Sequence, residues 1–405
     1  MGASGEKELN LRVNRLPSIT WNKLQINDAE VRQTIDLNGR GECIIHNIPA
    51  GVIIGSENCD SCSLGEDKRP FLPVRAGLPK EKEGNSDPAG KSDTASVEGR
   101  KVLDTNSVIL RTGMGEAAEK FFDENCNEAL SIRAICGAGG DKPLKLNYKL
   151  GDGDGYVVRQ KLIAEEGSTL TVIMDYSADK ENTGFFGVQT LAFAKKNSTI
   201  NIIKIQLLGQ GFTHFEDIGG FAQENAKINV IQMILGSGKS YVGMNVELAG
   251  YKSAFEGNVG YLCLGDQKLD MNYYIGHSGR RSTSSLRVEG ALSDNGAKVF
   301  RGTIDLKHGA KGAKGQEQEG TLLLSENVRN KTLPVILCDE DDVEGEHGAT
   351  IGRLSADMLF YMQTRGISEK EAELLMTKAK LNTVRNLIKD EHSIGKIQHY
   401  MESVF

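Results

Sequence analysis

The sequence predicts a mainly β protein built around a β-solenoid, and three observations support this fold class. The 405 residues include 47 Gly but only 8 Pro, which favours many tight turns between segments that keep their backbone hydrogen bonds. After Gly139 the apolar residues recur with a period of 2, as they do in half-buried strands. The same region repeats one seven-residue pattern, in which a Gly or Asn and two small or polar residues precede a strand that opens with Leu or Ile.

The seven-residue pattern recurs at intervals typical of a solenoid. Successive copies start 30, 28, 40, 31 and 34 residues apart. Gly and Asn adopt the left-handed backbone conformation most readily, so each copy is expected at a corner before a strand. The alternative is a β-sandwich, which needs closer turns with hairpin dipeptides, and only Asn295-Gly296 clearly offers one. The copies begin at Gly167, Asn197, Asn225, Gly265, Gly296 and Asn330.

Three regions precede the predicted β core. Residues 1–75 are mixed, and their apolar patch over Cys43–Ile54 predicts a strand, a turn and a strand. Residues 76–99 contain almost nothing to bury and predict a flexible linker. Residues 100–140 are predicted as a helical segment, because apolar residues recur at helical spacing from about 115 to 130.

The β core is expected over 141–352, followed by a C-terminal helical domain over 353–405. Ser355 is a suitable N-cap for a first helix, and Ser368-Glu-Lys-Glu371 is a capping box that opens a second. A third helix is expected from Thr383. These helices are expected either to cover the end of the solenoid or to present a docking surface of Met, Phe, Tyr and Leu side chains to another protein.

Charge and cysteine content indicate the compartment and the partners. A net charge of −7 and a pI near 5.7 give no electrostatic reason to expect nucleic acid. The first residues lack the apolar core of a signal peptide, and no apolar run approaches the ~20 residues that span a bilayer. Seven scattered cysteines fit free thiols in a reducing environment. We therefore expect a cytoplasmic protein with neither nucleic acid nor membrane as a partner.

Three short motifs are weak candidates for chemistry. Residues 236–240 (GSGKS) suggest a phosphate loop, but Met233 stands where the motif needs Gly, so a corner between strands is expected. The acidic Gly151–Gly155 segment lacks the rest of a calcium loop and predicts a turn. Cys59 and Cys62 form a single C-x-x-C without a second pair at zinc spacing. No catalytic constellation stands out, so we do not expect an enzyme.

The most concentrated chemistry lies between Cys338 and Gly348. This stretch holds a thiol, an imidazole and six acidic residues, and Cys, Glu and His are ligand types for iron and zinc. In an extended strand, Gly345 and His347 point to one face while Glu344 and Glu346 point to the other. The alternative is a solvated acidic edge strand whose charges prevent sheet-to-sheet aggregation.

The same stretch carries a resemblance to a known family. Its most specific part is Asp341-Asp-Val-Glu-Gly-Glu-His-Gly-Ala-Thr350, followed by Leu359-Phe-Tyr-Met-Gln-Thr-Arg-Gly-Ile367. Arg301-Gly-Thr-Ile-Asp305, the Gly309–Gly315 run and Thr321-Leu-Leu-Leu-Ser325 precede it. In these residues the chain resembles the SufB/SufD family of iron–sulfur cluster assembly scaffolds.

The resemblance implies a right-handed parallel β-helix flanked by helical regions, without enzymatic activity of its own. It implies a homodimer or a SufB–SufD heterodimer that associates through the β-helices. It also implies that the C-terminal helices, residues 355–405, dock the ABC-type ATPase SufC, which would bind the ATP. The cargo would be a nascent, transient iron–sulfur cluster.

Residue by residue, Glu346 and His347 match the Glu-His pair of SufB, and His347 matches the His of SufD. Gly345 stands where a typical SufD has Cys, so we hypothesise Cys338 as a substitute thiolate beside Glu346 and His347 as iron ligands. Cys263 is a hypothetical carrier of incoming sulfur. Two alternatives remain open. One is a purely structural partner in the SufBCD complex, and the other is a β-helix carbohydrate-active enzyme.

Overall fold

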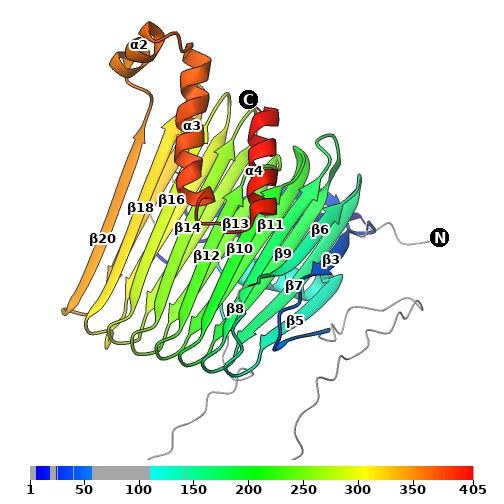
Figure 1. Cartoon of the computed structure of the whole chain (residues 1–405), viewed down its shortest axis with the longest axis vertical. Helices are drawn as coiled ribbons and strands as arrows, with labels where there is room; N and C mark the ends of the chain where they lie inside the picture. The colour runs from blue at the N-terminus through cyan, green and yellow to red at the C-terminus, as the bar shows by residue number, and fades with distance from the viewer. Residues whose placement is uncertain are drawn as a thin grey trace, which may run out of the picture.

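The computed structural model describes residues 6–18, 24, 26–39, 41–56, 110–140 and 142–404. These residues form a parallel β-solenoid of about 8 turns, followed in the chain by C-terminal helices (Figure 1). The mainly β solenoid that the sequence predicts is therefore confirmed. The expected linker over 76–99 and the Cys59–Cys62 pair lie outside the described residues.

Each turn of the solenoid gives one strand to each of two nine-stranded sheets, which we call sheet I and sheet II. Sheet I consists of β3 (Glu42–His46), β6 (Leu144–Leu150), β8 (Thr169–Ala178), β10 (Thr199–Leu207), β12 (Lys227–Ile234), β14 (Ala254–Cys263), β16 (Thr283–Leu292), β18 (Ala313–Leu323) and β20 (Val343–Gly352). Sheet II consists of β4 (Val52–Ser56), β5 (Glu128–Ala134), β7 (Asp154–Ala164), β9 (Thr183–Ala194), β11 (Gly211–Ala222), β13 (Lys239–Leu248), β15 (Lys268–His277), β17 (Ala297–Leu306) and β19 (Arg329–Cys338).

The main hydrophobic core fills the space between the two sheets. Side chains from every second position point inward, and those of neighbouring turns stack on one another. Leu170, Ile200 and Ile228, for example, stand in register on β8, β10 and β12 and are fully buried. Burying each such side chain stabilises the fold by about 1.5–3 kcal/mol, so the stacked turns support one another.

The repeated sequence pattern marks corners in both sheets. Gly167, Asn197 and Asn225 have φ values of 69°, 57° and 53° and lie just before strands of sheet I, as predicted. The later copies at Gly265 and Gly296 precede strands of sheet II instead. This change of sheet explains the interval of 40 residues in the middle of the series. From β5 and β6 onward all neighbouring strands within a sheet are parallel, which excludes the β-sandwich alternative.

The first end of the solenoid is formed by two consecutive strands that join different sheets. β3 and β4, predicted as the apolar strand-turn-strand patch, pair antiparallel with β6 and β5, one on each sheet. The helix predicted over 115–130 is shorter than expected, because α1 spans Glu116–Asn125 and the chain enters β5 at Glu128. The prediction was wrong there because Leu130, Ile132 and Ala134 are buried with a period of 2, not at helical spacing.

The outer face of sheet II is covered by N-terminal elements. β1 (Glu6–Val13) and β2 (Ala29–Asp36) form an antiparallel ribbon that packs with α1 against this face. Phe121 and Phe122 of α1 pack against Phe185 and Phe215 of sheet II. The ring centroid of Phe121 lies 5.6 Å from that of each of the other three. The N-terminal region is therefore packed onto the solenoid.

Helices α2 (Ala356–Thr364), α3 (Glu369–Arg385) and α4 (Glu391–Val404) follow β20. The Ser355 cap and the capping box between Ser368 and Glu371 are confirmed. The third helix begins at Glu391, not at Thr383, because α3 continues past that residue to bury Val384. No helix in the described part of the chain is long and apolar enough to cross a membrane.

α3 and α4 lie on the outer face of sheet I (Figure 1). Three ion pairs fix them there, namely Lys380–Glu289 at 2.9 Å, Lys396–Asp175 at 2.7 Å and Lys145–Asp390 at 2.6 Å. The helices thus cover a face of the solenoid and leave its last turn exposed, which corrects the expectation that they cover the end.

Candidate functional site

The last turn of the solenoid consists of β19 and β20, and it holds three of the four candidate residues. β20 pairs with β18 on one side, and no described strand pairs with its other edge. Residues 344–351 are exposed for this reason. Glu346 and His347 lie on this edge strand, and Cys338 ends β19. Glu346 and His347 therefore lie on one of the two edge strands of sheet I.

The side chains of Glu346 and His347 lie on opposite faces of sheet I. A Cβ added to Gly345 would lie 3.3 Å from Ile336 and 3.3 Å from Leu306, which belong to sheet II, so position 345 faces the interior. His347, two residues further, shares that face. Glu344 forms a 2.7 Å ion pair with the exposed Lys314 on the outer face, which Glu346 shares. The predicted alternation is confirmed.

Cys338 lies at the corner between β19 and β20. It is in register with Leu306, and its thiol donates a hydrogen bond to the carbonyl of Glu340 at 3.3 Å. Ile336 and Gly345 meet across the interior between this corner and His347. Cys338 is therefore about 13 Å from His347 along the strand direction, for four residues of β rise. Within one chain the structure does not bring these two residues together.

Cys263 is also distant from His347. It is fully buried at the end of β14, three strands from β20 in sheet I. Its thiol donates to the carbonyl of Gln267 at 3.1 Å, and burial raises its pKa to about 12. This thiol is therefore protonated and inaccessible to solvent in the folded chain.

Polar residues that the sequence analysis missed line the interior near the last turn. Lys298 of β17 pairs with Glu319 of β18 across the interior, and both are buried. Glu317, also buried on β18, has a pKa raised to about 8 by desolvation and by the nearby charge of Glu319. The available signal was the alternation of Glu with Gln and Gly in β18, which places charges at inward positions.

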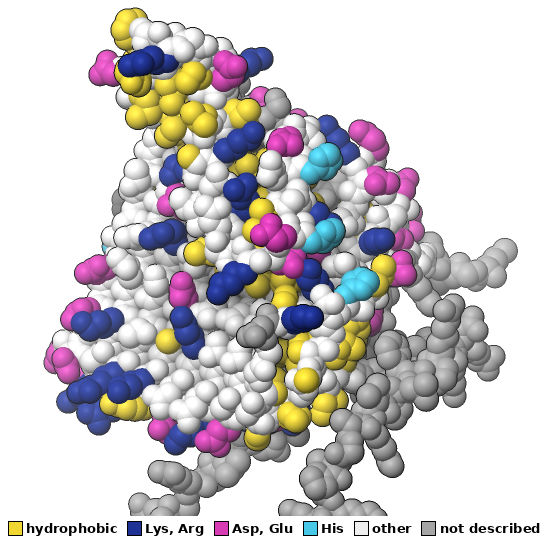
Figure 2. Space-filling model, viewed as in Figure 1, with side chains coloured by type: hydrophobic (Ala, Val, Ile, Leu, Met, Phe, Trp, Pro, Cys, Tyr) yellow, Lys and Arg dark blue, Asp and Glu magenta, His cyan; other side chains and the backbone are white. Residues whose placement is uncertain are grey.

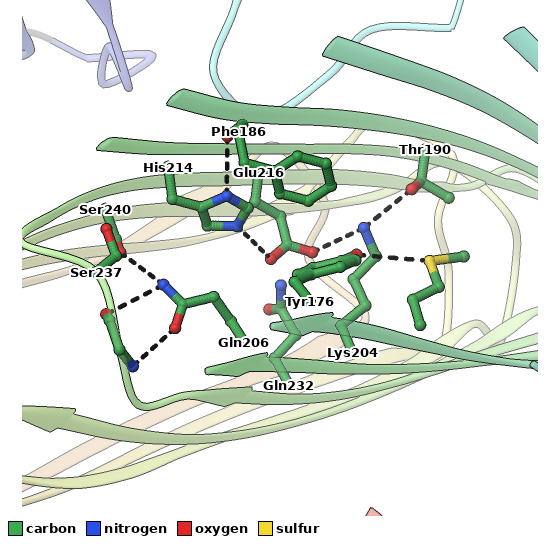
Figure 3. A network of polar contacts seen from close by, with 12 residues as sticks. Tyr176, Phe186, Thr190, Lys204, Gln206, His214, Glu216, Gln232, Ser237 and Ser240 are labelled. Carbon is green, nitrogen blue, oxygen red and sulfur yellow. Dashed lines mark hydrogen bonds and ion pairs between the residues drawn. The ribbon is translucent and has the colours of Figure 1, made fainter. Parts of the chain in front are cut away.

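A second polar network lies deep in the middle of the solenoid (Figure 3). The Lys204 ammonium contacts Glu216 at 2.7 Å and donates to Thr190 at 2.9 Å. His214 lies 3.3 Å from Glu216, and its Nδ1 is 3.0 Å from the carbonyl of Phe186. Burial alone would raise the pKa of Glu216, but Lys204 and His214 lower it to about 2. The network is closed and internally paired, so it is structural.

Two of the weaker motifs have the predicted local structure. Residues 236–240 turn from β12 into β13, with Ser237 at a φ of 70°, so this segment is a corner. Asp152 and Gly153 form a turn before β7, and Asp152 accepts a hydrogen bond from the backbone N–H of Thr183 at 2.9 Å. Neither segment forms the binding loop that its composition suggests.

Metal-ligating groups are sparse in a single chain. Among the described residues, no group of three His, Cys, Asp or Glu side chains is placed to hold a metal ion. The last turn offers an exposed imidazole on its inner face and an exposed carboxylate on its outer face. A complete ligand set there requires groups from outside the described chain.

Comparison with known proteins gives a consistent result. Residues 149–380 match the family described as "SUF system FeS cluster assembly, SufBD core domain". The chain is 26% identical over 318 residues to the iron–sulfur cluster assembly protein SufD of Bacillus subtilis, covering 74% of this chain and 73% of that protein. It is 24% identical to SufD of Escherichia coli over 233 residues, which span 58% of this chain and 55% of the relative.

The matched segment contains the solenoid from β7 to β20 and most of α3, so it includes both the fold and the candidate residues. The residues that carry the sequence resemblance, between 301 and 367, lie within this matched segment. The chain belongs to the SufBD core family of the SUF iron–sulfur cluster assembly system.

Proposed function

We propose that this chain is a scaffold subunit on which a nascent iron–sulfur cluster is built and from which it is transferred. The observation that carries the proposal is the position of His347, an imidazole exposed on the uncovered last turn of a SufBD-type solenoid. The cluster is cargo, and the chain itself catalyses no reaction. Imidazole, carboxylate and thiolate groups are suitable ligands for its iron.

The ligand set would be completed across a subunit interface. Glu346, His347 and Cys338 are the candidate iron ligands, and the structure keeps them apart within one chain. The free edge of β20 presents unpaired backbone N–H and C=O groups, which favour the addition of a strand from another chain. We propose that a second SufB/SufD-type chain, identical or related, docks on this edge through its own solenoid.

Cys263 is proposed to carry sulfur only in a transient, opened state. Its thiol would have to lose a proton before it accepted sulfur, and burial opposes that loss. All five described cysteines are free thiols, which supports a location in the reducing cytoplasm. A Cys263→Ser change that left sulfur incorporation unaltered would remove Cys263 from the proposal.

The C-terminal helices are proposed to dock a SufC-type ATPase, which would bind the ATP. α3 and α4 are held on sheet I, but α2 buries none of its residues. Its Phe360, Tyr361 and Met358 are 69%, 58% and 43% exposed, and Figure 2 shows this apolar group projecting from the body of the molecule. Exposed aromatic side chains of this kind are typical anchors of protein–protein contacts.

Cluster binding is tested by anaerobic reconstitution of the full chain, co-expressed with its ATPase, with iron and sulfide. Absorption and Mössbauer spectra should show a cluster in the wild type and much less in His347→Ala. A wild type without any cluster would favour the second candidate function, a purely structural partner subunit. Gly345 in place of a Cys, and the distance of Cys338 from His347, are the observations that favour this second candidate.

Docking is tested by replacing exposed side chains of α2, because deletion of 355–405 would also remove the apolar cluster beneath α3 and α4. The double change Phe360→Ala and Tyr361→Ala should abolish co-purification with the ATPase. Tyr251→Ala, at an exposed corner before β14 and outside these helices, is the matched control and should retain the complex. Co-purification that survives the α2 change would refute α2 as the docking surface.

A further inference from the structure

A buried carboxylate lies directly beside the candidate iron ligand His347. Glu317 of β18 is the register partner of His347 on β20. Neighbouring strands are about 4.8 Å apart, and paired residues of parallel strands point to the same face. The inward direction of this pair follows from Gly345, whose added Cβ would meet Ile336 and Leu306 across the interior. Glu317 and His347 therefore share the inner face of sheet I.

The carboxyl group of Glu317 is enclosed on the opposite side by the backbone of sheet II. A Cβ added to Gly302 of β17 would overlap the carboxyl group of Glu317, so this carboxyl group lies directly against the backbone at Gly302. The side chain of Glu317 therefore lies between Gly302 and the open last turn.

No cation neutralises Glu317 in the described part of the chain. Its neighbour Glu319 takes the only buried ammonium nearby, that of Lys298. Glu317 is 3% exposed, and no other residue that the structure describes forms an ion pair or hydrogen bond with its side chain, so burying its charged form is costly. The outward Glu346, by contrast, is solvated on the other face of the strand. The inner face thus has a carboxyl group without a partner next to an accessible imidazole.

We propose that Glu317 and His347 together bind Fe²⁺ on the inner face of the last turn, with sulfide or a docked chain supplying the remaining ligands. The inference rests on the proposed scaffold function and changes its ligand set, because it assigns the carboxylate to Glu317 instead of Glu346. Carboxylate and imidazole are a suitable pair for Fe²⁺. Iron would also supply the positive charge that the buried carboxyl group lacks.

The test is anaerobic equilibrium dialysis of the full chain against Fe²⁺ alone, for wild type and four variants. Glu317→Gln and His347→Ala should each weaken iron binding about tenfold or more, a loss typical of a disrupted metal site. The double variant should lose little beyond the larger single loss, because both residues would hold one ion. Glu346→Gln, the carboxylate on the opposite face, should stay within about twofold of wild type.

The outcomes separate this inference from the scaffold function. A wild type that binds no Fe²⁺ would overturn the inference, whereas the scaffold function is decided separately by the reconstitution with iron and sulfide. If the wild type binds Fe²⁺ and Glu317→Gln binds it within twofold of the wild-type affinity, the inference alone is overturned. The same holds if only Glu346→Gln and His347→Ala lose Fe²⁺ affinity. Thermal melting of each variant checks folding. If Glu317→Gln does not fold, Glu317→Asp replaces it in the test. This variant keeps the charge but shortens the side chain by one methylene. It must show the loss of Fe²⁺ binding, or the inference fails.

Discussion

The middle of the solenoid and its last turn contain the same kinds of polar side chain but differ in how these are paired. In the middle, Glu216 lies between Lys204 and His214, and Phe186 fixes the imidazole. Near the last turn, Glu317 lies beside His347 without a cation, and the edge of β20 is open. The first group is a closed network, whereas the second is an incomplete one with access to solvent.

This difference separates a structural role from a functional one. A buried charge pair contributes little net stability when intact, but removing one partner leaves an uncompensated charge. Mutations in the middle should therefore strongly lower the free energy of unfolding. Mutations at the last turn should change ligand binding and leave the fold intact. The predictions below test this contrast.

The largest effect is expected at the centre of the closed network. Lys204→Met should lower the free energy of unfolding by about 3–5 kcal/mol, because Glu216 would remain buried without its ammonium partner. Urea denaturation measures this loss. Adding Glu216→Gln to the same chain should recover most of it, since the uncompensated charge is then gone. A single variant that loses less than about 1 kcal/mol would contradict a structural role for the pair.

A smaller, pH-dependent effect is expected at Asp217, which follows Glu216 on β11 but has no ion pair among the described residues. It accepts a hydrogen bond from the backbone N–H of Met114 at 2.8 Å, and burial raises its pKa from 3.8 to about 7. The folded chain keeps this proton up to about pH 7, whereas the unfolded chain loses it near 3.8. Asp217 therefore favours folding most at low pH, and this contribution is lost as the pH rises through that window.

Asp217→Asn should remove that part of the pH dependence. Between pH 4.5 and 7.5 the free energy of unfolding of the wild type should fall by on the order of 2–3 kcal/mol more than that of the variant. Urea denaturation at the two pH values measures both changes. If the wild type and the variant have parallel pH profiles, Asp217 is ionised in the folded chain. The lack of a cationic partner would then not separate Asp217 from Glu216.

The solenoid could be predicted because its signals are local and repeated. Gly and Asn at the corners, and apolar residues at every second position, follow directly from the backbone conformations that a β-coil needs. The two-sheet arrangement was less accessible, since the same pattern precedes strands of sheet I at Gly167 and of sheet II at Gly265. The boundary of α1 was predicted wrongly because Leu130 suits a helix as well as a strand.

The candidate site could be predicted only along one strand. Alternation placed Gly345 and His347 on one face and Glu346 on the other, as the structure has them. It could not identify Glu317, because Glu317 and His347 become neighbours only when β18 and β20 pair, and these strands are one solenoid turn apart in sequence. Partners set by stacking between turns depend on the exact length of each turn, which no local pattern encodes.

The smallest effect on stability is expected at His347 itself. Its imidazole is exposed on an edge strand, so His347→Ala should change the free energy of unfolding by no more than a surface substitution does, which is within about 0.5 kcal/mol. Differential scanning calorimetry of the metal-free chain measures this. His214→Ala is the matched control, because that imidazole is fully buried against Phe186 and Tyr176 and its removal should cost several times more. Equal losses for the two histidines would place His347 in a structural network, and the contrast between the closed middle and the open last turn would no longer hold.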